Sequence, residues 1–317
     1  MKRITLADIA KECGVSVNTV SHVLNDKPDI SEQKKKEIKN IAEKMGYISN
    51  SAASFLRTGK SKSIGIIIGD IVNPSFSINI RLLENEFRKH GYSFMVFDSG
   101  EDEKVEKQAI IEAIGKAVDG IILCPSQRSE DNIHFLLERQ IPFVLMGRRF
   151  QNVDTNYVIC DDYDSGRQAA EYLIGNNCKK IACLMMKTHV SSAAERLDGI
   201  KSVYKKYGLE LKKKDCYLVP GELTSRATYM KQIIEKDYDG VICFSDIWAL
   251  EFMSYVKRDI KVVSFDNIRT HFYVPCDLPS IGTKKEDFCH AILEVLLATM
   301  KGQEKKVHMV FQTEIYH

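Results

Sequence analysis

From Ser63 onward the chain alternates short apolar runs with more polar stretches of about a dozen residues. The apolar runs are rich in isoleucine and valine: IGIIIGD, YSFMVFD, GIILCP, PFVLMG, KIACLMM, GVICFSD and KVVSFD. Runs of this length predict buried strands, and the stretches between them predict helices. Because strands that alternate with helices form sheets covered on both faces, we expect an α/β fold of doubly wound parallel sheets.

The number of predicted strands favours two lobes over a single sheet. Seven or more strands lie in about 250 residues, which is more than one small domain holds. The stretch YVICDDYDSGRQAAEYLI begins a new helix–strand series near residues 160–162. We therefore place the boundary between the two lobes there.

The first 25 residues predict two short helices separated by a glycine. Thr5 and Asp8 can form a capping box before the first helix, and Ser16 can cap the second. Gly14 stands where the first helix must end, because glycine adopts a positive φ at little cost. The apolar residues expected to face inward are Ala7, Ile9, Ala10, Cys13, Val20, Val23 and Leu24.

The spacing of Ala10, Gly14 and Val20 is typical of a helix-turn-helix. In such a unit the outward face of the second helix can enter a major groove. The candidates for base contact are Val17, Asn18, Ser21 and His22, and those for phosphate contact are Ser16, Thr19 and Asn25. Val17 offers no hydrogen bond, so it would contact a thymine methyl group. A helical hairpin without a nucleic-acid role remains the alternative.

The residues that follow strengthen the nucleic-acid interpretation. SEQKKKEIKNIAEKMGY predicts a third helix capped by Ser31, and ISNSAASFLRTGKSKS is too polar to fold alone. That second segment either orders on a partner, with a leucine wedged into a minor groove, or is a plain linker. Residues 1–62 hold 12 Lys/Arg and 7 Asp/Glu, a net charge of +5, whereas the remainder carries −3. This asymmetry favours an anionic partner for the N-terminal segment.

The stretch from TLADIAKECGVSVNTVSHVLN to FLRTGKSKSIGIII closely resembles the DNA-binding end of the LacI/GalR family of bacterial transcription regulators. The resemblance implies an all-α helix-turn-helix headpiece over residues 1–48 and a hinge helix or linker over residues 49–61. It implies a two-lobed effector-binding and dimerisation domain, similar to periplasmic binding proteins, over residues 62–317. The chain would cross between the lobes near residues 160, 282 and 310.

The resemblance also implies roles for individual residues of the headpiece and hinge. Val17, Asn18 and His22 match the positions that read bases, and Leu56 matches the minor-groove wedge. The other implied DNA contacts are Thr5, Leu6, Ser16, Thr19, Ser21, Asn25, Tyr47, Asn50 and Ala53. Two residues depart from the family: Ser49 stands where proline is usual, and Ser54 stands where many members have arginine. These departures predict a looser hinge or a different reading of the minor groove.

Candidate ligand-binding residues follow the apolar runs, because ligands of open parallel sheets bind beyond the carboxyl ends of the strands. These residues are Asp70, Asn73, Pro74, Ser75, Phe76, Arg148, Arg149, Asp161, Asp162, Ser191, Ser192, Glu195, Arg196, Asp246, Trp248, Asp266 and Asn267. Carboxylates, guanidinium groups, an amide and aromatic rings together suit a polyhydroxylated ligand. Simpler interpretations also stand. Arg196 and Asp198 could form a surface ion pair, Asn73-Pro74 could be a turn, and Trp248 could lie in the core or an interface. The possible helix caps are Asp161, Asp162, Ser191 and Asp246.

The family resemblance narrows this set. NPSF, VICDDYDSGRQAAEYLI, AERLDGIKSVYKKYGL, CFSDIWAL and VSFDN look like the effector domain of the same family. The residues implied to line the cleft are Asn73, Phe76, Arg148, Asp161, Arg196, Trp248 and Asp266, with Arg196 and Asp266 foremost. Gly147 departs from the family, because many members have aspartate there.

We therefore expect a cytoplasmic homodimeric repressor that binds a near-palindromic operator and responds to a small effector. A sugar is the favoured effector, and a purine stays open. A solute-binding protein and a sugar-metabolising enzyme are the alternatives. The N-terminus has no secretory signal, and no phosphate-binding glycine loop, catalytic triad or metal-ligand spacing is present. We expect no catalytic activity, no metal and no cofactor. The nine cysteines form no Cys-x-x-Cys pair, and Cys124, Cys183 and Cys243 are expected in the core.

Overall fold

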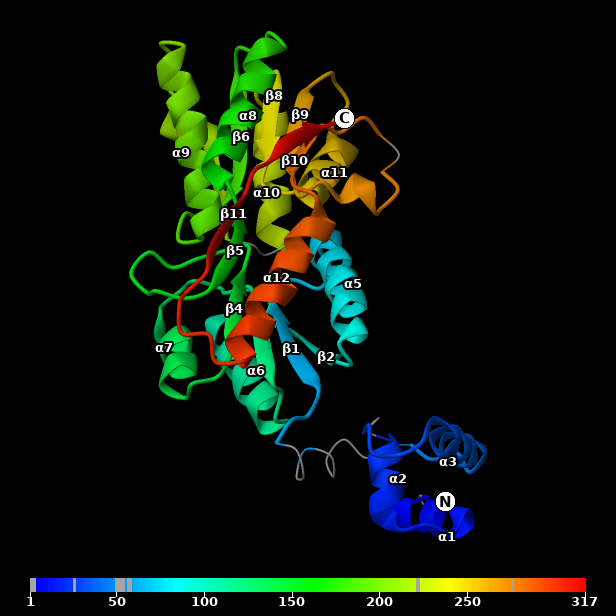
Figure 1. Cartoon of the computed structure of the whole chain (residues 1–317). Coiled ribbons are helices and arrows are strands. Elements are labelled where there is room, and N and C mark those ends of the chain that lie inside the picture. The colour runs from blue at the N-terminus through cyan, green and yellow to red at the C-terminus, as the bar shows by residue number, and fades with distance from the viewer. Residues whose placement is uncertain (1–3, 25–26, 49–54, 56–58, 221–222, 275) are drawn as a thin grey trace. The chain divides into compact units, whose positions relative to one another are not determined.

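Figure 1 shows the chain as a computed structural model, which describes residues 4–24, 27–48, 55, 59–220, 223–274 and 276–317. The chain divides into two compact units, Met1–Ser61 and Lys62–His317. We call them the N-terminal unit and the large unit.

Three helices form the described part of the N-terminal unit: α1 (Leu6–Cys13), α2 (Val17–Leu24) and α3 (Glu32–Lys44). The predicted capping is confirmed, because Thr5 and Asp8 form a capping box and the Ser16 hydroxyl accepts a hydrogen bond from the Thr19 amide at 3.0 Å. Gly14 ends α1 in the left-handed conformation with φ of 62°. The core of the unit consists of Ile9, Ala10, Val20, Val23, Ile38 and Ala42.

Two expectations for this unit are wrong. Ala7 is exposed, because Leu6 rather than Ala7 lies on the helical face that packs against the core. Ser21 is buried, with only 7% of its surface exposed, instead of facing outward. The reason is that α2 packs against both α1 and α3, so that more of its surface is covered than one apolar stripe predicts.

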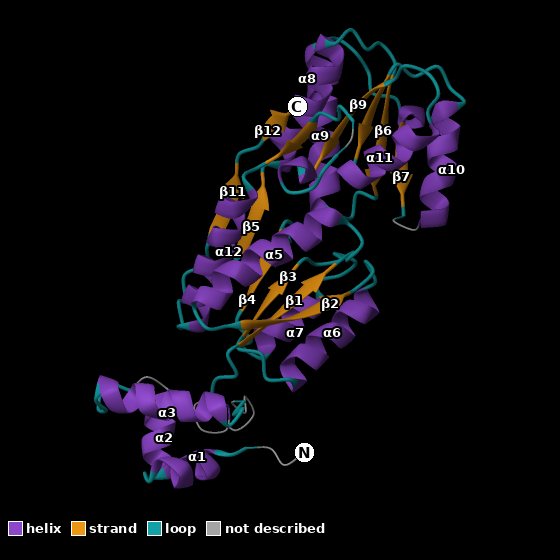
Figure 2. Ribbon diagram, turned by 90° about the vertical axis from the view of Figure 1, so that its right-hand side faces the viewer, coloured by secondary structure: helices purple, strands orange, loops and turns teal. Residues whose placement is uncertain are grey.

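Two six-stranded sheets form the large unit, and each has helices on both faces (Figures 1 and 2). We call the sheet of order β11-β5-β4-β3-β1-β2 and its helices lobe 1. Its elements are β1 (Ser63–Ile68), α5 (Pro74–Lys89), β2 (Ser93–Asp98), α6 (Glu103–Gly115), β3 (Gly120–Leu123), α7 (Asp131–Glu138), β4 (Phe143–Met146), β5 (Tyr157–Cys160), α12 (Lys285–Met300) and β11 (His308–Phe311).

Lobe 2 is the sheet of order β12-β10-β9-β8-β6-β7 with its helices. Its elements are α8 (Asp162–Gly175), β6 (Ile181–Met186), α9 (Ser191–Lys206), η1 (Lys213–Asp215), β7 (Cys216–Val219), α10 (Leu223–Ile234), β8 (Gly240–Cys243), α11 (Asp246–Tyr255), β9 (Lys261–Phe265), η2 (Ile268–Thr270), β10 (Ser280–Gly282) and β12 (Glu314–Tyr316). The sequence did not predict β7, whose four residues form a short strand at the edge of the sheet.

The helices form layers around apolar cores. In lobe 1, α5 and α12 cover one face of the sheet and α6 and α7 cover the other. In lobe 2, α8 and α9 cover one face and α10 and α11 cover the other. The predicted doubly wound architecture is therefore confirmed, and Cys124, Cys183 and Cys243 are buried as expected.

The chain passes between the lobes three times, after β5, after β10 and after β11. The third passage carries the C-terminal segment from lobe 1 to lobe 2, where β12 pairs with β10 (Figure 1). This pairing is antiparallel, unlike the other described pairings, because β12 enters its sheet from the opposite end. None of the described helices is long and apolar enough to cross a membrane.

Candidate functional site

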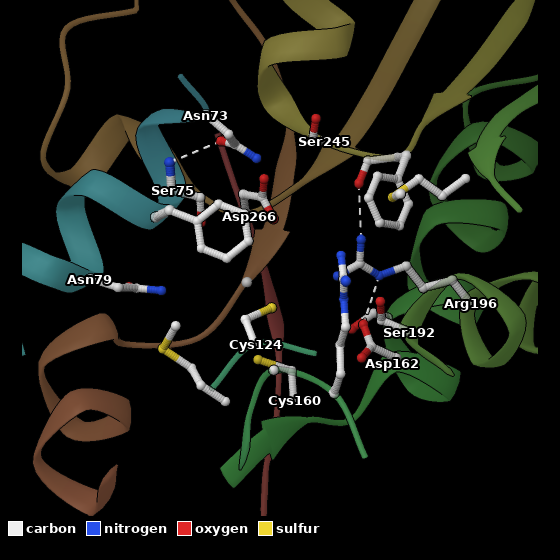
Figure 3. Close-up of a pocket in the computed structure, with 18 of the residues that line it drawn as sticks. Asn73, Ser75, Asn79, Cys124, Cys160, Asp162, Ser192, Arg196, Ser245 and Asp266 are labelled. Carbon is white, nitrogen blue, oxygen red and sulfur yellow. Dashed lines mark hydrogen bonds and ion pairs between the residues drawn. The ribbon is translucent and has the colours of Figure 1, made fainter. Parts of the chain in front are cut away.

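A cavity of about 180 Å³ lies between the two lobes, at the carboxyl ends of their strands. Its lobe 1 wall is built by residues that follow β1, β2, β3 and β4, and its lobe 2 wall by residues at or after the ends of β6, β8, β9 and β10. Figure 3 shows side chains from both lobes pointing into this space. The crossovers thus bring together residues that are far apart in the sequence, and the volume suits a small molecule.

Most of the cleft residues implied by the family resemblance line this cavity. They are Asn73, Phe76, Arg148, Arg196, Trp248 and Asp266. Asp161 is not among the lining residues: its carboxylate caps α8 by accepting a hydrogen bond from the Asp164 amide at 2.9 Å, and the neighbouring Asp162 lines the cavity. The Asp162 carboxylate accepts a hydrogen bond from Arg196 Nε at 2.7 Å.

The structure does not support the other simple interpretations, in which Asp246 and Ser191 cap helices and Arg196 pairs with Asp198. Neither Asp246 nor Ser191 caps a helix, because the caps of α11 and α9 are Ser245 and Val190. Arg196 does not pair with Asp198, which binds Lys201. Of these residues, only Asp161 therefore has the helix-capping role that the simpler interpretation gave it.

Arg196 is held in place by three elements of lobe 2. Its Nε donates to Asp162 Oδ1 at 2.7 Å, its Nη1 donates to the Phe244 carbonyl at 2.9 Å, and its guanidinium lies 4.2 Å from the centre of the Phe265 ring. Burial raises the pKa of Asp162, whereas the arginine opposes that shift. The planar guanidinium is thereby fixed at the cavity wall with an edge available to a ligand (Figure 3).

Asp266 follows β9 and points into the cavity (Figure 3). Burial raises its pKa to about 6, and the nearby Asp246 carboxylate adds to this effect, whereas Arg196, Lys285 and a hydrogen bond from Asn73 oppose it. The residue adopts φ of 102°, and the adjacent Asn267 adopts φ of 47°. This strained turn directs a carboxylate at the ligand space, where it can accept hydrogen bonds from hydroxyl groups.

Asp246 lies behind Asp266 and supports this turn. Its carboxylate accepts hydrogen bonds from Ser264, from the Ser280 hydroxyl at 2.6 Å and from the Ile268 amide at 2.8 Å. With 1% of its surface exposed, it binds protein groups rather than a ligand. Asp246 therefore positions β9, β10 and the turn that carries Asp266.

On the lobe 1 wall, Arg148 forms a bidentate ion pair with Glu101. Nη1 lies 2.7 Å from Glu101 Oε2 and Nη2 lies 2.8 Å from Glu101 Oε1, and Nη1 also donates to the Pro125 carbonyl at 2.7 Å. Gly69 leaves room for this pair, because a Cβ atom at that position would stand 2.1 Å from Glu101 Oε1. The arrangement engages both Nη1 hydrogens and one Nη2 hydrogen, which leaves Arg148 fewer donors to offer a ligand.

Aromatic and sulfur-containing side chains complete the cavity. Phe76, Phe244, Trp248 and Phe288 supply apolar surface, and Cys124 and Cys160 lie on its lobe 1 side. Burial raises the pKa of each of these two thiols to about 12, which makes them apolar wall groups rather than nucleophiles. Among the described residues, no group of His, Cys, Asp and Glu is arranged to hold a metal ion.

Sequence reasoning missed four charged or amide side chains of the cavity wall: Asn79, Glu101, Arg226 and Lys285. Glu101 follows the run YSFMVFD, so the rule that identified the other candidates would have found it if applied to that run. The other three lie on the helices α5, α10 and α12, for which position after a strand gives no signal.

The N-terminal unit presents a polar surface on α2. Val17 has 46% of its surface exposed, and Asn18 is also exposed. His22 is partly exposed, and its Nδ1 lies 2.6 Å from Asp29 Oδ2. Leu6 is half-buried against the helical core, and Thr5, Ser16 and Thr19 lie at helix starts. Tyr47 is half-buried, whereas Asn25, Asn50, Ala53 and Leu56 lie outside the described residues.

Comparisons with known proteins agree with both units. Residues 5–50 match the bacterial regulatory proteins of the lacI family, and residues 61–268 match the periplasmic binding proteins and sugar binding domain of the LacI family. The HTH-type transcriptional repressor PurR of Aliivibrio fischeri (strain MJ11) is 26% identical over 314 residues, covering 95% of this chain and 93% of that protein.

Solved structures show the same fold. The lac repressor dimer bound to operator and the anti-inducer ONPF aligns with a TM-score of 0.83 at 20% identity, covering 100% of this chain and 98% of that chain. The complex of the transcriptional regulator CelR with cellobiose aligns with a TM-score of 0.70 at 22% identity, covering 99% of each chain.

Proposed function

Because this chain belongs to the LacI family of bacterial regulatory proteins, it is a DNA-binding transcriptional regulator, and we propose that it is a homodimeric repressor of a near-palindromic operator. We further propose that a sugar bound between the lobes changes its operator affinity. It would act in the cytoplasm, where the DNA is, and without catalysing a reaction.

The proposed operator contacts lie on the N-terminal unit. The exposed Val17 and Asn18 of α2 would read base edges in the major groove, together with His22. The proposed backbone and hinge contacts are Thr5, Leu6, Ser16, Thr19, Ser21, Asn25, Tyr47, Asn50, Ala53 and Leu56. Ser21 is buried, so its contribution would be to hold α2 in place rather than to contact bases.

The proposal of a sugar effector rests on one observation: polar groups and aromatic rings line the same cavity. Asp266 and Arg196 of lobe 2 offer an acceptor and donors, Asn73 of lobe 1 offers an amide, and Phe76 and Trp248 offer apolar faces. A sugar presents hydroxyl groups along its rim and apolar C–H faces, so it matches this set. Relatives named for purine repression make a purine base the second candidate.

The proposed mechanism follows from the position of the cavity between the lobes. A ligand that contacts both walls binds the closed arrangement more tightly than the open one, and it therefore shifts the equilibrium toward closure. In a homodimer this closure would change how the two DNA-binding units are presented to the operator. The coupling is reciprocal, so operator binding would change effector affinity by the same factor.

Fluorescence anisotropy with a labelled palindromic fragment from upstream of the protein's own gene tests the DNA function. We expect binding far tighter than to unrelated DNA over a salt series. Asn18→Ala should weaken it by about tenfold or more, the usual cost of losing a good base contact. Asn40→Ala, the same substitution at an exposed position of α3, is the matched control and should have little effect. Equal, purely salt-dependent binding to both DNAs would contradict sequence-specific repression.

The same assay with panels of sugars and purines tests the effector. One compound should shift the operator affinity of the wild-type protein. Asp266→Asn should reduce that response while leaving the affinity of the effector-free protein for operator unchanged. If the purine panel alone acts, the purine candidate replaces the sugar.

A further inference from the structure

The charged residues of the cavity wall neutralise one another. Four lining residues carry a positive charge and four carry a negative charge: Arg148, Arg196, Arg226 and Lys285, and Asp70, Glu101, Asp162 and Asp266. Each of the three arginines hydrogen-bonds a carboxylate. The partners are Glu101 for Arg148, Asp162 for Arg196 and Glu251, from outside the lining, for Arg226.

Lys285 is balanced in a different way. Its ammonium donates to the Ser75 hydroxyl at 3.2 Å, and its charge acts on Asp266 and on Asp246 behind it. An anion brought to Lys285 would therefore lie close to these carboxylates. Lys285 provides no isolated positive site for a phosphate.

From this neutralisation we infer that the cavity admits uncharged ligands and rejects phosphorylated ones, and that Glu101 is the residue that decides this selectivity. The inference rests on the proposed function, because it concerns the chemical class of the effector. A phosphate group would have to be buried beside arginines that already hold carboxylates, and an uncompensated buried charge is costly.

Glu101 has the decisive position for three reasons. Its carboxylate accepts hydrogen bonds from both Nη1 and Nη2 of Arg148, whose side chain is only 6% exposed. It lies at the cavity itself, whereas Glu251 holds Arg226 from outside the lining. Gly69 leaves room for it, because a Cβ atom there would stand 2.1 Å from Glu101 Oε1, and Glu101 itself adopts φ of 60°. Without this carboxylate, Arg148 would be a buried cation with a free fork for phosphate oxygens.

Titration with inorganic phosphate tests the inference without knowledge of the effector. Calorimetry and thermal unfolding of the full-length chain would be measured in phosphate and in chloride of matched ionic strength. We expect no saturable binding by the wild-type protein at millimolar phosphate. Glu101→Gln should gain saturable binding, with an increase in affinity of tenfold or more, and the double variant Glu101→Gln/Arg148→Met should lose that gain.

Glu101→Ala provides a second route if the glutamine amide still occupies Arg148. Saturable phosphate binding by the wild-type protein that Arg148→Met abolishes would overturn the inference. A failure of both Glu101 variants to gain binding, with their unfolding transitions still cooperative, would overturn the role of Glu101. Operator binding would be measured on the same samples. If the proposed function is wrong, the wild-type protein will not recognise operator, whereas a failure of the phosphate inference leaves operator recognition intact.

Discussion

Gly166 on α8 faces the backbone of Arg196 on α9, and a Cβ atom at position 166 would stand 2.0 Å from the Arg196 carbonyl oxygen. The contact is reciprocal, because a Cβ atom at Gly199 on α9 would stand 2.0 Å from the Tyr163 carbonyl oxygen on α8. Two glycines thus let the helices cross at close range. This crossing brings Asp162, at the start of α8, within 2.7 Å of Arg196.

Gly166→Ala should therefore damage both stability and ligand response. The added methyl group meets backbone rather than a movable side chain, so we expect a loss of about 1–3 kcal/mol in the free energy of unfolding. Separation of α8 and α9 should also loosen the Asp162–Arg196 pair and reduce the effector response. Thermal unfolding and the anisotropy assay measure the two effects.

Gly175→Ala is the matched control, because Gly175 ends the same helix and a Cβ atom added there would meet no atom of the described residues within 4 Å. This substitution should be neutral or stabilise by up to about 1 kcal/mol, as alanine favours the helix. Equal stability of the two variants would show that the close crossing is not needed.

The contrast between Gly166 and Asp161 shows what the sequence could predict. Periodicity and alternation predicted the two-lobed architecture, because burial imposes those patterns directly. Position after a strand predicted that Asn73 and Asp266 lie at the cavity, but it could not decide between Asp161 and Asp162, since capping depends on where the helix starts. The close crossing at Gly166 and the Glu101–Arg148 pair depend on packing between distant segments. No local pattern reports such packing.

The pKa of Asp266 predicts a pH-dependent contribution to stability. Burial raises its pKa in the folded protein to about 6, above the ordinary value of 3.8. The folded state therefore binds the proton more tightly than the unfolded state. The resulting stabilisation is fully present below pH 4 and is lost as the pH rises through 6.

Asp266→Asn should consequently be more stable than the wild-type protein above pH 6, by on the order of 2 kcal/mol. This difference should shrink toward pH 4, where the wild-type carboxyl group is protonated. Chemical denaturation of both proteins between pH 4 and 8 measures it. A difference that does not change with pH would mean that Asp266 has an ordinary pKa.

A substitution in the buried core of the N-terminal unit should abolish DNA binding without affecting the large unit. Ile38 on α3 is fully buried, and its replacement by alanine leaves a cavity that typically costs about 2–5 kcal/mol. So small a unit has little stability to lose. Ile38→Ala should therefore abolish operator binding while the large unit keeps its thermal transition.

Ile48→Ala controls for the loss of side-chain atoms, because Ile48 has 73% of its surface exposed. It should leave the helical content of the N-terminal unit unchanged. If Ile38→Ala also lowered the transition of the large unit, the two units would not fold independently.

Two hydrogen bonds link the lobes at one side of the cavity, and we call this pair of contacts the polar latch. Arg149 of lobe 1 donates through Nη2 to Glu195 Oε1 on α9 of lobe 2 at 2.9 Å, and the Gln127 Oε1 of lobe 1 accepts from the Ser191 amide at 2.8 Å. Burial raises the pKa of Glu195, whereas Arg149 opposes that shift. These contacts stabilise this arrangement of the lobes relative to any arrangement in which the lobes lie further apart.

Glu195→Gln should weaken the latch and thus lower effector affinity by about 3- to 10-fold, because a partly exposed ion pair contributes on the order of 1 kcal/mol. Operator affinity in the absence of effector should change less. Glu171→Gln is the matched control, since Glu171 pairs with Lys206 and Arg167 within lobe 2 and spans no cavity. Calorimetric titration with the compound identified in the anisotropy assay measures both variants. If Glu171→Gln weakened the effector as much as Glu195→Gln, the effect would reflect lost charge in lobe 2 and not the link between the lobes.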